Sequence, residues 1–186
     1  MIAFIIGNGV SRKPIDLHQL KGKGTIFGCN ALYRDFNDYD YLVAIDNLII
    51  GELNNEANDK RLIIPPKKEQ WELNGSGKRS NAGMNAMLEA IRRNHNKLYC
   101  LGFDFLVRDD ISTDNMYKNT FAYGPITHAS QSDNFNRTRY LEWFAGDNKE
   151  ISFTFVLPSN NKYYSLNAPN ITGMGVDKFI EKVASL

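Results

Sequence analysis

The sequence predicts an α/β fold with a mostly parallel sheet. Short apolar runs followed by turn residues recur along the chain, as expected of strands that are buried on both faces. Amphipathic helical patterns lie between several of these runs, and strands alternating with helices form parallel sheets through right-handed crossovers. A length of 186 residues suits one domain better than two. We therefore expect one Rossmann-like domain over residues 1–186, with helices on both faces of the sheet.

Each predicted strand is a continuous apolar run, and each predicted helix has an apolar stripe. The predicted strands are 3–6, 25–28, 41–45, 61–64, 97–101 and 152–156, and the predicted helices are 82–94, 133–144 and 176–184. The helix 82–94 is the clearest, because Met84, Met87, Leu88 and Ile91 recur at helical spacing. The polar stretches 65–79, 108–128 and 159–170 are predicted to be loops at the carboxyl ends of the strands, where open α/β sheets bind ligands.

Composition indicates which kinds of binding partner and which cellular compartment suit the chain. With 22 Lys and Arg against 21 Asp and Glu, the chain has no net field that would hold nucleic acid. Cys29 and Cys100 follow apolar runs without metal-binding spacing, which favours buried thiols in a reducing compartment. The apolar run 1–6 is too short for a signal peptide, and no segment approaches the roughly 18 residues of a membrane span. We expect a cytoplasmic protein without a transmembrane segment, as a monomer or homo-oligomer.

A glycine-rich turn follows the first predicted strand, with the sequence Gly7-Asn8-Gly9-Val10-Ser11. The glycines let the backbone approach a phosphate or ribose, while Asn8 and Ser11 supply hydrogen-bond donors. The turn is not the dinucleotide fingerprint. Arg12 stands where GxGxxG needs glycine, and Cys29-Asn30 replaces the acidic residue expected at the end of the second strand. A tight strand-to-helix connection would explain the same glycines equally well.

Another glycine-rich segment precedes the helix predicted at 82–94. Gly75-Ser76-Gly77-Lys78 resembles the end of a phosphate-binding P-loop, but Arg79 replaces the required Ser or Thr, which excludes an NTPase. Ser80 and Gly83 then lie at a helix start that can receive an anion. A solvated loop with an ordinary N-cap is the alternative interpretation.

Acidic and histidine side chains supply the remaining candidates. Asp104 follows the strand 97–101, where it can bind a sugar hydroxyl or cap the neighbouring loop. Asp38-Tyr39-Asp40 matches a metal-binding Asp-x-Asp pattern, but it precedes a strand and is interpreted as a turn with two solvated acids. We predict no metal site. His128 ends a long polar loop and can act as a general base, whereas His18 and His95 are expected at the surface.

The order of these motifs resembles one enzyme family. IIGNGVSRKPIDLHQLKGKGTIFGCNALYRDF resembles the start of the bacterial sialyltransferases of glycosyltransferase family 42, with their GNGPS-type turn, ID-x-x-x-L segment and RCN-x-F/Y strand end. AGMNAMLEAIRRNHNKLYCLGFDF is similar to their SG-headed helix and GIDF strand end. Three later elements are similar to the family's GHS, LEF and CPNS motifs: Thr127-His128-Ala129-Ser130, Tyr140-Leu141-Glu142-Trp143-Phe144 and Leu157-Pro158-Ser159-Asn160. The resemblance covers roughly residues 2–161. Motility-associated factor glycosyltransferases and pterin pyrophosphokinases share the same core.

The resemblance implies a glycosyltransferase that moves a sugar, such as sialic acid, from a CMP-linked donor to a hydroxyl of a glycan or other acceptor. The donor is a substrate, and neither a metal nor a separate cofactor is implied. The implied nucleotide-binding residues are Asn8, Gly9, Ser11, Asn30, Asp46, Ser80, Gly83 and Asp104. His128 matches the general base, and Tyr117 or Tyr123 would stabilise the departing phosphate.

Two other functions are compatible with the same core. Pyrophosphoryl transfer to a pterin-like alcohol would require a magnesium cluster, for which Asp46 and Asp104 are the obvious ligands. A non-catalytic nucleotide-binding protein with a degenerate transferase core is favoured by Ala82 and Leu106, which replace the serine and tyrosine of the family.

Overall fold

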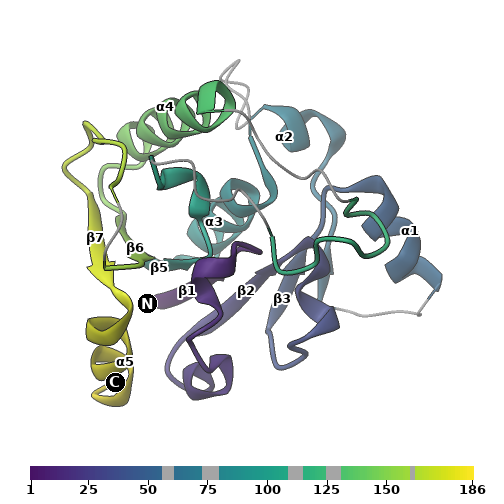
Figure 1. Ribbon diagram of the computed structural model, residues 1–186, viewed down its shortest axis with the longest axis horizontal. Coiled ribbons are helices and arrows are strands. Elements are labelled where there is room, and N and C mark those ends of the chain that lie inside the picture. Colours follow the sequence, from purple (N-terminus) through teal and green to yellow (C-terminus); the bar gives the residue numbers. More distant parts are fainter. Residues whose placement is uncertain (56–60, 73–79, 109–114, 125–130, 160–161) are drawn as a thin grey trace.

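The computed structural model describes residues 1–55, 61–72, 80–108, 115–124, 131–159 and 162–186. Its strands form one seven-stranded sheet in the order β4-β3-β2-β1-β5-β6-β7 (Figure 1). The strands are β1 Ile2–Ile6, β2 Thr25–Cys29, β3 Tyr41–Val43, β4 Leu62–Ile63, β5 Lys97–Leu101, β6 Ser152–Leu157 and β7 Ile171–Gly175. Every pairing between these neighbours is parallel, which confirms the predicted α/β class and the parallel sheet.

The order of the strands reverses direction once, next to β1. From β1 the chain builds outward through β2, β3 and β4, and it then returns to place β5 on the other side of β1. Ala3 is therefore in register with Thr25 of β2 and with Leu98 of β5. Such a reversal opens a crevice at the carboxyl ends of the strands, where α/β proteins of this kind bind ligands.

Helices cover both faces of the sheet, as predicted. They are α1 Asn47–Asn55, α2 Lys67–Trp71, α3 Ala82–Arg92, α4 Gln131–Asp147 and α5 Val176–Ala184. In β1, Ala3 and Ile5 join the core under α3 and α4, while Phe4 and Ile6 join the core on the face of α1 and α5. This alternation is the period of a strand, and it explains why the run is apolar on both sides.

Three elements depart from the predictions. The polar stretch 65–79 contains the short helix α2, and the chain after β3 forms α1. The seventh strand, β7, was not predicted because Gly173 and Gly175 weaken a strand pattern. Its parallel pairing with β6 holds this segment in a strand, although its composition does not favour one.

His95 was expected at the surface, and this expectation is wrong. The side chain is 5% exposed, with Nδ1 lying 3.0 Å from the Ala90 carbonyl oxygen and Nε2 lying 2.9 Å from Thr25 Oγ1. The ring therefore joins the end of α3 to the start of β2. Burial became possible because both ring nitrogens found hydrogen-bond partners.

Other predictions of local structure are confirmed. Cys29 and Cys100 are free and buried, and burial raises the pKa of the Cys29 thiol to about 12. Asp38 and Asp40 are exposed in the turn before β3, where Asp40 accepts a hydrogen bond from the Ile26 amide at 2.7 Å. Among the described residues, no helix combines the length and apolar character that a membrane crossing requires.

Candidate functional site

A pocket of about 250 Å³ lies at the carboxyl ends of the central strands, where the strand order reverses. We call it the switch-point pocket. Its lining residues are Gly7, Asn8, Cys29, Asn30, Asn81, Ala82, Gly83, Gly102, Phe103, Phe105, Asn115, Tyr123 and Arg137. Asn8 follows β1, Asn30 follows β2, and Gly83 belongs to the first turn of α3. Three residues that are distant in the chain thus line one pocket.

The glycines of the first turn allow two loops to pack closely. The Gly7 amide donates to the Leu101 carbonyl at 2.8 Å, and the Gly9 amide donates to the Gly102 carbonyl at 3.0 Å. A Cβ atom at Gly7 would lie 2.6 Å from the Gly102 oxygen, and Gly102 itself has a φ of +73°. Both glycines are therefore required by the connection itself, and the turn directs Asn8 into the pocket.

Asn8 and Tyr123 bring polar atoms into the pocket without satisfying them. Asn8 Oδ1 and the Tyr123 hydroxyl are buried, and neither meets the geometry of a hydrogen bond to a described residue, although the Asn8 side chain lies close enough to the phenol to lower its pKa as a hydrogen bond does. Burial raises the pKa of Tyr123, and the nearby Asp46 carboxylate raises it further, while the Asn8 side chain and Arg34 oppose this. The phenol therefore stays protonated as a donor. Asn8 and Tyr123 both line the pocket, so water or a ligand there can pair with these two atoms.

Asn30 joins the ends of two neighbouring strands. Its Oδ1 accepts hydrogen bonds from the Ile45 amide at 3.1 Å and the Asp46 amide at 3.4 Å, so it ties β2 to the segment after β3. The residue has a φ of 47°, in the left-handed region that asparagine tolerates better than most residues. These bonds use the carbonyl oxygen and orient the side chain at the pocket wall.

The first turn of α3 forms another wall of the pocket. Asn81 caps this helix by accepting the Met84 amide at 2.9 Å, and Ala82 and Gly83 follow it. The first backbone amides of a helix have no partner inside the helix and carry partial positive charge, which suits an anion. Gly83 is also a packing residue, because a Cβ there would lie 2.4 Å from Phe103 Cε1.

Ser11 and Asp104 bond to each other beside the pocket. The Ser11 amide donates to Asp104 Oδ2 at 3.1 Å, and the Ser11 hydroxyl donates to Asp104 Oδ1. Burial raises the pKa of Asp104, and the hydrogen bonds from Ser11 oppose that change. Two roles were predicted for Asp104, binding a sugar hydroxyl or capping the neighbouring loop. The structure shows a contact with a loop, but this loop is the one after β1.

Ser80 and Asp46 also have backbone partners. Ser80 Oγ lies 2.8 Å from the Glu69 carbonyl oxygen and 2.6 Å from that of Gln70, in a pocket next to the switch-point pocket. Asp46 Oδ1 accepts the Leu48 amide at 3.0 Å and so caps α1. Neither residue lines the switch-point pocket. Asp46 acts on it through its charge near Tyr123.

Tyr117 belongs to a network with buried Arg12 and exposed Asp35, outside the pocket lining. Its hydroxyl donates to Asp35 and accepts from Arg12 Nη2 at 2.9 Å. Arg12, which is 3% exposed, also pairs with Asp35 at 3.1 Å and donates from Nε to the Gly7 carbonyl at 2.9 Å. Burial and the bond to Asp35 raise the pKa of Tyr117. Of the two tyrosines, Tyr123 is the one that lines the pocket.

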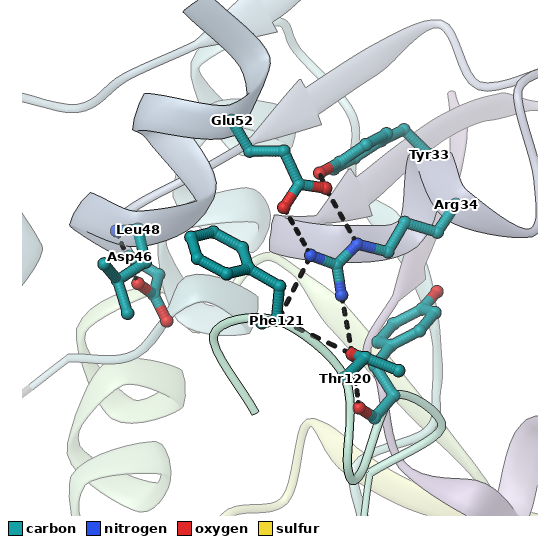
Figure 2. Close-up of polar contacts among 8 residues, drawn as sticks. Tyr33, Arg34, Asp46, Leu48, Glu52, Thr120 and Phe121 are labelled. Carbon is teal, nitrogen blue, oxygen red and sulfur yellow. Dashed lines mark hydrogen bonds and ion pairs between the residues drawn. The ribbon is translucent and has the colours of Figure 1, made fainter. Parts of the chain in front are cut away.

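Arg34 holds Thr120 and Phe121, two residues of the segment that precedes Tyr123 (Figure 2). Its guanidinium donates to Thr120 Oγ1 at 2.8 Å and to the Phe121 carbonyl at 3.1 Å. It also pairs with Glu52 of α1 at 2.6 Å, and this bond lowers the pKa of Glu52. Arg34, Asn115 and Arg137 were not predicted as site residues, because their contacts join segments with no shared sequence motif.

Some sequence predictions lie outside the described residues. His128 and the glycine-rich segment 75–77 both belong to this group. Over the ranges that the structure does describe, no three His, Cys, Asp or Glu side chains are grouped so that they could hold a metal ion.

Comparison with known proteins gives similarities to solved structures, among them two sialyltransferase structures. No protein-family model and no curated protein matches the chain. The sialyltransferase CstII from Campylobacter jejuni, in complex with the substrate analogue cytidine-5'-monophosphate, is 16% identical over 91% of this chain and 85% of that chain, with a TM-score of 0.47. The sialyltransferase CST-II in complex with a trisaccharide acceptor and CMP is 15% identical over 91% of this chain and 87% of that one, with a TM-score of 0.46. At such identities a shared function does not follow from the similarity.

Proposed function

We propose that the chain is a glycosyltransferase that binds a CMP-linked sugar in the switch-point pocket and transfers the sugar to an acceptor hydroxyl. The supporting observation is the convergence of Asn8, Asn30 and Gly83 on one pocket at the reversal of strand order. A nucleotide needs amide groups for its base and ribose and a positive region for its phosphate. The two asparagines and the start of α3 offer these groups.

In the proposed reaction, the bond between the anomeric carbon and the phosphate oxygen breaks while a bond to the acceptor oxygen forms. Tyr123 donates a hydrogen bond to the departing phosphate, and the amides at the start of α3 stabilise its negative charge. His128, assigned by its motif, takes the proton of the acceptor hydroxyl. Ser11 and Asp104 support the turn that carries Asn8, because their polar groups bond to each other.

This proposal is favoured over pyrophosphoryl transfer by the contacts of the two candidate carboxylates. Asp46 caps α1, and Asp104 bonds to Ser11 within the turn after β1. Each carboxylate has a backbone hydrogen bond, and among the described residues neither belongs to a group of three His, Cys, Asp or Glu side chains that could hold a magnesium ion.

A thermal-shift experiment with nucleoside monophosphates tests the proposal. We expect CMP at about 100 times its dissociation constant to stabilise the protein by about 2.7 kcal/mol, which raises the melting temperature by about 5–10 °C. UMP, GMP and AMP should produce smaller shifts at the same concentration. A shift with purine nucleotides alone would contradict a CMP-linked donor.

The matched variant is Asn30→Asp. It keeps an oxygen for the Ile45 and Asp46 amides and tolerates the left-handed backbone, but it places a negative charge in the pocket. The apo variant should melt near the wild type and lose most of the CMP shift. An unchanged CMP shift in Asn30→Asp would show that the nucleotide binds elsewhere.

A further inference from the structure

A second pocket, of about 220 Å³, adjoins the switch-point pocket between α2, α3 and α4. We call it the Trp71 pocket. Its lining residues are Trp71, Ser80, Asn81, Met84, Asn136, Arg137 and Tyr140. Asn81 and Arg137 line both pockets, so the two are neighbours across the start of α3. A molecule in the Trp71 pocket would therefore lie next to a ligand in the switch-point pocket.

Trp71 is the unusual residue of this pocket. Its side chain is 72% exposed, the most exposed of the large hydrophobic residues that the structure describes. It ends α2, and its carbonyl accepts the Ser80 amide at 3.1 Å, which fixes the backbone beneath the indole. Tryptophan is highly buried on average, and here the exposed indole forms one wall of a pocket whose other walls carry polar groups.

The other walls combine polar groups with an aromatic ring. Asn136, Arg137 and Tyr140 come from one stretch of α4, and the guanidinium of Arg137 lies 3.4 Å from Asn134 Oδ1. The Tyr140 ring packs edge-on against Trp143 at 5.4 Å, which limits its freedom. Ser80 Oγ is bonded to backbone carbonyls, so it supports the floor of the pocket.

We propose that the Trp71 pocket binds a neutral sugar ring of the acceptor glycan, an inference that rests on the proposed glycosyltransferase function. The C–H face of a pyranose is apolar and stacks on an indole, while its hydroxyls pair with amide and guanidinium groups. Asn136, Asn81 and Arg137 supply these groups beside Trp71. The shared wall at Asn81 would hold the acceptor next to the donor.

Tryptophan fluorescence tests this inference directly, because the chain has two tryptophans. In Trp143→Phe, Trp71 is the sole fluorophore; in Trp71→Phe, the sole fluorophore is Trp143, which does not line the pocket. We would titrate each variant with lactose, cellobiose and chitobiose at saturating CMP. A saturable change in Trp143→Phe that is larger than any change in Trp71→Phe is the expected result, because Trp143 meets the pocket through the ring of Tyr140.

Kinetics with an accepted disaccharide supply a second measurement. Trp71→Ala should raise the acceptor KM by about tenfold, a size typical of losing one stacked ring, while the CMP dissociation constant stays unchanged. An acceptor KM that does not move overturns the inference.

The two proposals fail in different ways. If CMP shifts the melting temperature but no disaccharide changes the fluorescence of Trp71, the acceptor site is wrong and the donor site stands. If a disaccharide changes that fluorescence but no nucleotide binds, the acceptor role is overturned together with the transferase function.

Discussion

At the scale of single residues, Tyr117 and Tyr123 lie on one short segment, yet their hydroxyls have opposite surroundings. The Tyr117 hydroxyl bonds to exposed Asp35 and buried Arg12, whereas the buried Tyr123 hydroxyl has only the Asn8 side chain near hydrogen-bonding position among the contacts described. A hydrogen bond made within the protein contributes to its stability. A buried hydroxyl without such a bond costs stability unless a ligand pairs with it. The same chemical group therefore has different consequences at the two positions.

The corresponding prediction compares two Tyr→Phe variants. Tyr117→Phe should lower the free energy of unfolding by about 1 kcal/mol, because it removes hydrogen bonds while Arg12 and Asp35 remain paired. Tyr123→Phe should leave stability unchanged or slightly raised, and should lower kcat by about 100-fold if its hydroxyl stabilises the leaving phosphate. Urea denaturation and single-turnover kinetics measure the two effects.

Each variant is the control for the other. A loss of stability in Tyr123→Phe larger than in Tyr117→Phe would show that the Tyr123 hydroxyl has a structural partner. Equal losses of kcat in both variants would show that the segment is catalytically important only as a whole.

At the scale of elements, the glycines of α1 and α3 meet different surroundings. A Cβ at Gly83 of α3 would lie 2.4 Å from the Phe103 ring, whereas a Cβ at Gly51 of α1 would meet nothing within 4 Å. Helix propensity favours alanine over glycine at both positions by up to about 1 kcal/mol. At Gly83 a packing clash opposes this gain and determines whether alanine stabilises or destabilises the protein, whereas at Gly51 the described residues make no such clash.

We predict opposite effects of two Gly→Ala substitutions. Gly83→Ala should destabilise the protein by about 1–3 kcal/mol, because the methyl group displaces Phe103 from its packed position. Gly51→Ala should stabilise it by about 0.5–1 kcal/mol. Calorimetric melting of both variants checks this, and a stabilising Gly83→Ala would mean that α3 is less tightly packed on Phe103 than described.

The same elements show what the sequence could predict. β5 and α5 match their predicted bounds, because a run buried on both faces and an amphipathic stripe each leave a periodic pattern. The shared pocket of Asn8, Asn30 and Gly83 was also predictable, since the carboxyl ends of parallel strands lie along one edge. The choice between Tyr117 and Tyr123 was not, because it depends on Arg12 and Asp35, which approach only in three dimensions.

Ser80 and β7 show the limits more sharply. Ser80 was predicted at a helix start that can receive an anion, but its hydroxyl contacts two carbonyls of α2, a helix that the polar composition of its segment concealed. β7 contains two glycines and becomes a strand through pairing with β6. In both cases a distant segment outweighed the local preference.

At the scale of the whole molecule, the two cysteines report on the cooperativity of the sheet. Cys29 lies in β2 and Cys100 in β5, on either side of β1, and burial raises the pKa of both thiols. Thiol reagents attack the thiolate, so both cysteines should react slowly in the folded protein, Cys29 through the pocket that it lines, and rapidly only when the sheet opens. If residues 1–186 form one domain, the same opening exposes both.

We predict that both thiols become reactive in a single urea transition that coincides with the loss of circular dichroism. Saturating CMP should move both midpoints to higher urea by the same amount, because the ligand stabilises the folded state as a whole. Quantitative labelling followed by peptide mass spectrometry assigns each thiol. Separate midpoints for Cys29 and Cys100 would contradict a single cooperative domain.

The hydrogen bond between the Gly9 amide and the Gly102 carbonyl has a consequence for how the protein ages. Asparagine followed by glycine loses ammonia when the glycine nitrogen attacks the asparagine side chain and closes a succinimide ring. In the folded protein that nitrogen is held by Gly102, so the Asn8-Gly9 pair is shielded from this reaction. Unfolded chains lack the shield, and water then opens the succinimide to aspartate or, more often, to isoaspartate, so each deamidated chain carries a carboxylate at position 8. Shelf life and the chemistry of the pocket are thereby linked through one backbone contact.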